Sequence, residues 1–136
     1  MIGAAGVAIK EVESQLASLG LLLLEDRDYG ATFSNATHTL HVASEPHYPG
    51  LSISLRNACG ETYELGLLAR LIAPESYAKA NVPRGKDSQE MFGLSNMVRF
   101  LLENKALVFE QPASYSAAYQ EAAKLCLAKF GLSGAI

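Results

Sequence analysis

The stretch from 51 to 65 constrains the fold most, because apolar and polar residues alternate along it on both sides of a short turn. A period of two is typical of strands with one buried face. A two-residue turn would set Leu55 opposite Thr62 and mix the faces. A three-residue turn sets Leu55 opposite Tyr63, so that the apolar residues share one face, and it ends on Gly60, where a left-handed backbone is needed. The pattern therefore predicts an antiparallel hairpin with a three-residue turn. The same register pairs Asn57 with Glu61 and Ile53 with Leu65.

The alternation continues through residues 29–66, with a turn around Asn35. One face is apolar and the other carries mostly Ser and Thr, which predicts an antiparallel sheet covered on one side. The preceding run "LLLLEDRD", at 21–28, could be a short buried strand or a helix extension, and we expect the strand. Four tyrosines fall on predicted apolar faces and are expected in the core, with their hydroxyls at its edge: Tyr29, Tyr63, Tyr115 and Tyr119.

Apolar residues at helical spacing lie before and after this β region. The first helix is expected to bury one stripe and to end at a Gly20 cap: Ile9, Val12, Leu16 and Leu19. Helices are also expected at 67–72, which Pro74 ends, and from Asp87, whose spacing to Glu90 is that of a capping box. The buried stripe of the helix that begins at Asp87 is expected to be Met91, Leu94, Val98, Leu101 and Leu102. A short extended piece is expected at 106–112, "ALVFEQP". The last helix, ended by Gly131, should have one apolar face: Tyr115, Ala118, Tyr119, Ala122, Leu125 and Cys126.

These elements predict an α+β fold in a single domain over residues 1–136. An antiparallel sheet of three to five strands is preceded by one helix and followed by helices packed on its apolar face.

Composition bears on partners and location. The chain has 14 acidic and 11 basic residues and no basic run, which argues against nucleic acid and against an anionic membrane surface. The run Leu21–Leu24 is too short to span a bilayer. With two cysteines, Cys59 and Cys126, and no basic leader, we expect a cytoplasmic protein with reduced thiols.

Charged residues make up 18% of the chain, below the roughly 25% of an average domain. So few charges leave apolar surface that a monomer does not comfortably expose. We therefore expect a homodimer, or a stable complex with another protein.

All three histidines fall within ten residues, His38, His41 and His47. In a strand, His38 shares the face of Leu40 whereas His41 points to the other face, and His47 lies in a following turn. Ligands on opposite faces cannot hold one metal, so no metal site is expected. Cys59, at a hairpin tip, lacks the surroundings of a nucleophile.

The acidic run 25–28 lacks calcium-loop spacing and is expected to be a solvated turn. No catalytic residue and no cofactor is therefore assigned. One weak anion-site candidate remains, Arg84 and Lys86, because they precede a helix N-terminus.

These observations favour a non-enzymatic protein that acts by protein–protein binding or self-association, such as a bacterial adaptor or immunity-type protein. The alternative is a small-molecule-binding protein or an enzyme, with a pocket between sheet and helices.

Overall fold

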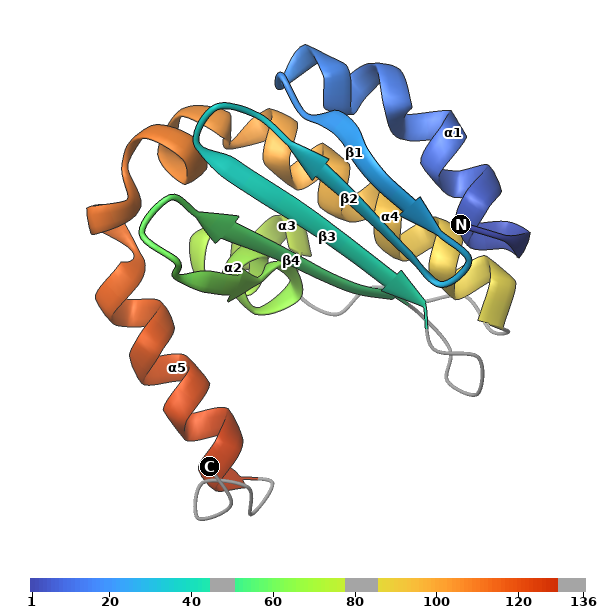
Figure 1. Cartoon of the computed structure of the whole chain (residues 1–136). Coiled ribbons are helices and arrows are strands. Elements are labelled where there is room, and N and C mark those ends of the chain that lie inside the picture. Colours follow the sequence, from blue (N-terminus) through green and yellow to red (C-terminus); the bar gives the residue numbers. More distant parts are fainter. Residues whose placement is uncertain (45–50, 78–85, 130–136) are drawn as a thin grey trace.

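The computed structural model describes residues 1–44, 51–77 and 86–129, and within them it has one antiparallel five-stranded sheet with helices before and after it (Figure 1). The α+β prediction is confirmed. The N-terminal half comprises α1 (Gly3–Ser18), β1 (Leu22–Arg27), β2 (Gly30–Ser34), β3 (His38–Ser44), β4 (Leu51–Asn57) and β5 (Thr62–Glu64). The helices that follow are α2 (Leu65–Ile72), α3 (Pro74–Tyr77), α4 (Lys86–Glu103), the π-helical η1 (Ala106–Glu110), the 3-10 turn η2 (Pro112–Ser114) and α5 (Ser116–Lys129).

The strands follow one another in space in chain order, β1 to β5, as short antiparallel connections favour. Alternate residues of β2 to β5 are buried against α1, α2 and α4, which lie on one side of the sheet. The residues between them form the other side, which we call the open face, and no described helix covers it in Figure 1. The sheet is therefore one-sided, as its alternation predicts.

The hairpin of β4 and β5 has the predicted register. Leu55 lies opposite Tyr63, and Gly60 has φ 88°. The Asn57 amide donates to the Glu61 carbonyl at 2.9 Å, so the three-residue turn is confirmed. The expected pair of Ile53 with Leu65 is wrong, because the chain turns into α2 at that residue.

Glu64 causes that early change of structure. Its carboxylate accepts hydrogen bonds from the amides of Gly66, at 3.0 Å, and Leu67, at 2.7 Å. It thereby caps α2, so the helix begins at Leu65 and β5 has only three residues. As predicted, α2 ends before Pro74.

The other helices agree with prediction in part. Gly20 follows α1 with φ 76°, as its expected role at the C-terminus requires. The stripe of α4 is buried at Leu94, Val98 and Leu101. The expected helix start at Asp87 lies one residue late, because α4 already includes Lys86.

Two segments contradict the sequence predictions. Residues 106–110 are π-helical, not extended, because the Val108 amide continues the helical bonding to the Asn104 carbonyl, at 2.9 Å. In α5 the expected apolar face is buried only near its start: Tyr119 is buried whereas Ala118 and Leu125 are exposed. Figure 1 shows the reason, since α5 runs away from the sheet. Gly131, its predicted end, lies outside the described residues.

Candidate functional site

The exposed part of β1 is the most unusual surface of the described chain. Leu22, Leu23 and Leu24 are 63%, 45% and 70% exposed, and we call them the leucine edge. A short buried strand was expected for this run. The strand is confirmed and Leu21, which precedes it, is buried, but the burial expected for Leu22, Leu23 and Leu24 is wrong, because β1 is an outer strand of the sheet and α1 packs on α4.

The three side chains leave β1 in different directions. Leu22 lies opposite Ser34 and therefore belongs to the open face, whereas Leu23 lies opposite Phe33 on the covered side. The pairing then slips, so Leu24 has no partner in β2. This bulge turns one leucine outward and interrupts the ladder. The edge thus presents aliphatic side chains on both faces of β1.

Tyr29 is exposed beside this strand, although it was expected in the core. It lies in the turn between β1 and β2, after Arg27 and before Gly30, so the alternation of β2 does not reach it. Its side chain is 50% exposed. Tyr29 thus adds a further large ring to the exposed surface beside β1.

The opposite edge of the sheet is closed by α5. The Glu64 amide, on β5, donates to the Tyr119 hydroxyl at 2.7 Å. The ring of Tyr63 packs edge to face on those of Tyr115 and Tyr119, with centroids 5.3 and 4.8 Å apart. Burial, followed by the neighbouring Tyr63 and Glu61, raises the pKa of Tyr115 to about 12. Three of the four predicted core tyrosines are therefore confirmed.

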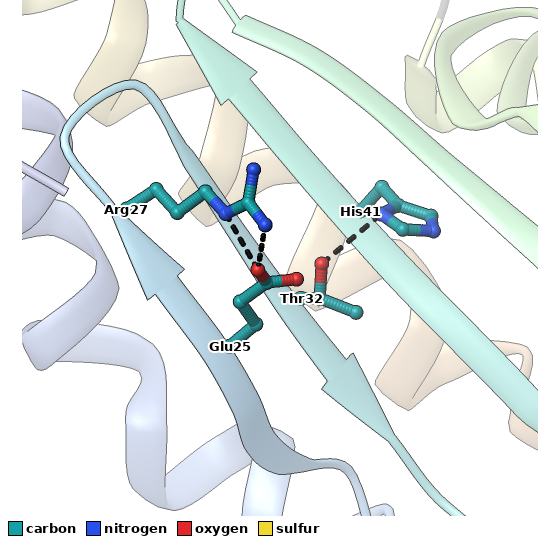
Figure 2. Close-up of polar contacts among 4 residues, drawn as sticks. All are labelled: Glu25, Arg27, Thr32 and His41. Atoms are coloured by element: carbon teal, nitrogen blue, oxygen red, sulfur yellow. Dashed lines mark hydrogen bonds and ion pairs between the residues drawn. The ribbon is translucent and has the colours of Figure 1, made fainter.

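The open face next to the leucine edge carries polar groups that pair locally (Figure 2). Arg27 forms an ion pair with Glu25, with Nε 2.5 Å from the carboxylate. Thr32 Oγ1 lies 3.1 Å from His41 Nδ1. The four side chains surround a hollow of about 260 Å³. Because the cation and the carboxylate satisfy each other, this surface has little net charge and can be desolvated at modest cost.

The histidines take the predicted opposite faces. His41 is exposed on the open face, whereas His38 is 7% exposed on the covered side. Desolvation by burial lowers the pKa of His38. Its ring packs edge to face on Phe109 of η1, with centroids 4.9 Å apart. His47 lies outside the described residues, and within residues 1–44, 51–77 and 86–129 no three His, Cys, Asp or Glu side chains are grouped to hold a metal ion.

A second hollow, of about 250 Å³, lies where α1 ends near η1. Asn35, Lys105, Phe109 and Glu110 contribute to its lining. Asn35 is already occupied, because its side chain donates to the Leu19 carbonyl at 3.2 Å and accepts from the His38 amide at 2.8 Å. Asn35 is thus engaged within the chain, and the charged groups of the lining are Lys105 and Glu110.

Where the structure describes them, the other residues singled out from the sequence do not form a group that could act as one site. Arg84 lies outside the described residues, and Lys86 is the first residue of α4 as described, so the anion-site prediction stays untested. Cys59 is an exposed free thiol at the hairpin turn, where its amide donates to Asn57 Oδ1 at 3.1 Å. Cys126 lies within α5.

Within the described part of the chain, no helix has both the length and the apolar character that crossing a bilayer requires. The comparisons add no relative: no protein-family model, no curated protein and no solved structure matches this sequence.

Proposed function

We propose that this protein acts by binding protein at the leucine edge, and that a second copy of the chain is its partner. One observation carries the proposal: three consecutive leucines of an outer strand, Leu22, Leu23 and Leu24, are 45–70% exposed. Fully burying one such side chain stabilises a complex by about 1.5–3 kcal/mol. A contiguous apolar group on an outer strand is a typical association site.

The neighbouring surface supports the same use. The open face beside Leu22 carries small hydroxyl side chains, such as Thr32 and Ser34, and the internally paired Glu25 and Arg27. A partner can cover such groups without stranding an unpaired charge. Since the bulge at Leu24 breaks the ladder, the contact should rest on side-chain packing more than on strand-to-strand hydrogen bonds.

The alternative of a small-molecule pocket has less support. Two hollows lined by described residues, of about 250 and 260 Å³, are smaller than the roughly 300–1,000 Å³ of most ligand pockets. In the hollow of 260 Å³ Glu25 pairs with Arg27 and Thr32 with His41, and in the hollow of 250 Å³ Asn35 bonds to the backbone.

Light scattering after gel filtration at micromolar concentration tests the proposal. The wild type should have about twice the 14.6 kDa chain mass. Leu24→Lys should shift the mass to that of one chain, because it places a charge inside the contact. Leu71→Lys is the matched control, since Leu71 is a 37% exposed leucine on α2, away from β1.

The outcomes separate the parts of the proposal. A monomeric wild type overturns self-association. A partner from the native host that wild type and Leu71→Lys both capture, but Leu24→Lys does not, would then assign the leucine edge to another protein. Equal capture by all three chains would overturn the edge as the binding surface.

A further inference from the structure

Where the structure describes burial, His38 is the one buried residue with a polar or charged side chain other than the tyrosines. It begins β3 on the covered side of the sheet. Its Nδ1 lies 2.7 Å from the Thr37 hydroxyl oxygen, and its ring meets the ring of Phe109 at 83°. The titratable ring is therefore part of the contact between the end of the sheet and η1.

The π-helical segment η1 contacts the rest of the protein mainly through Leu107, Val108 and Phe109. Val108 is fully buried, and its carbonyl accepts a hydrogen bond of 2.6 Å from the Tyr115 hydroxyl. Phe109 is partly buried and packs on the core next to His38. The other residues of η1, Ala106, Leu107 and Glu110, are exposed or half-buried. Single-turn π-helical segments are frequent at functional sites.

Charged groups near this contact do not favour a protonated imidazole. Asn57 lies opposite His38 in the sheet, and its amide group donates to the Glu61 carboxylate at 2.9 Å. On the η1 side, Lys105 and Glu110 line the adjacent hollow with Phe109. Burial is the cause of the lowered pKa of His38, and no carboxylate compensates for it.

We propose that protonation of His38 releases η1 from the end of the sheet, which makes this contact an acid-sensitive device. A proton adds a charge to a ring that is largely removed from water, and opening the contact returns that ring to water. One proton is taken up for each opening, and no other reactant is needed.

The sign of the effect follows from linkage. The closed contact holds the pKa of His38 below the 6.5 of the solvated side chain, so the open form binds more protons between those two values. The closed form therefore keeps its full stability above about pH 6.5 and loses it as the pH falls toward the lowered pKa. The opening equilibrium should rise by up to about tenfold for each unit between the two pKa values.

Amide hydrogen exchange of residues 106–110, corrected for the intrinsic effect of pH, tests this in the full chain between pH 7.5 and 5. Protection of these amides should fall with acid in the wild type and in His41→Gln, the control on the open face. It should stay constant in His38→Gln, which cannot take up the proton. Equal loss of protection in His38→Gln would overturn the proposal.

A second readout does not depend on whether His38→Gln folds. In NMR titrations of the wild type, the His38 ring and the amides of η1 should change with the same midpoint, below the 6.5 of a solvated histidine. A His38 titration that leaves the amides of 106–110 unchanged would overturn the proposal.

Discussion

The two edges of the sheet are treated in opposite ways. At β5, α5 brings the Tyr119 hydroxyl onto the Glu64 amide, and three tyrosine rings bury one another. At β1 the described chain supplies no comparable cover, and Leu22 and Leu24 are more than 60% exposed. An uncovered outer strand is an association risk that proteins usually control. The difference is the basis of our proposal that β5 serves stability whereas β1 binds a partner.

The largest test of this comparison removes one large side chain from each edge. Tyr63→Ala should lower the free energy of unfolding by about 3–5 kcal/mol, because the fully buried ring leaves a cavity. Leu24→Ala, at a 70% exposed site, should change the stability of the monomer by no more than about 0.5 kcal/mol. Urea unfolding at a concentration that keeps the chain monomeric measures both. Similar losses at the two sites would contradict the division into a stabilising edge and a binding edge.

A smaller effect is expected from the hydroxyl that closes β5. Tyr119→Phe keeps the ring but removes the acceptor of the Glu64 amide. A donor left without its partner there should cost about 1–2 kcal/mol of unfolding free energy. Tyr29→Phe is the control, since that tyrosine is half exposed in a turn. If the two variants are equally stable, the hydrogen bond to Tyr119 does not stabilise the β5 edge.

The turn that leads into β5 should give the smallest effect. Gly60→Val forces a β-branched residue to φ 88° and should destabilise the fold by at least about 1 kcal/mol. Gly93→Ala places its methyl group in open space within α4 and should instead stabilise by up to about 1 kcal/mol. Thermal unfolding compares them, and a neutral Gly60→Val would show that the turn conformation is not a constraint on this edge.

The sequence predicts the β4–β5 hairpin well because the relevant information is local. Face alternation and one glycine are enough to specify the pairing of Leu55 with Tyr63. The same applies to the opposite faces of His38 and His41, which follow from a period of two.

The candidate site is predicted less well because it depends on position in the sheet. A run of leucines indicates burial, and no residue in it reports that β1 lies at an edge without a covering helix. The absence of alternation in 21–24, in contrast to the clean alternation of β4, is the one signal that sets this strand apart. The prediction for Tyr29 is wrong for a related reason, since Tyr29 lies in the turn and the pattern of β2 begins only after it.

The prediction of an extended segment at 106–110 is wrong because a short apolar run does not distinguish a strand from a helix. What decides it is the length of the preceding α4 and the partners of Val108, its amide to Asn104 and its carbonyl to Tyr115. These contacts join different elements, so the seven residues 106–112 cannot predict them by themselves.

Cysteine cross-linking tests the proposed interface most directly. In a chain with both native cysteines changed to serine, Leu24→Cys should form a disulfide-linked dimer under mild oxidation. In a two-fold contact centred on the leucine edge, the symmetry axis passes close to Leu24, so the two copies of this residue come within disulfide distance. Leu71→Cys, an exposed site on α2, should remain a monomer. Dimers that form equally at both positions, or at neither, would contradict the claim that the leucine edge is where two copies meet.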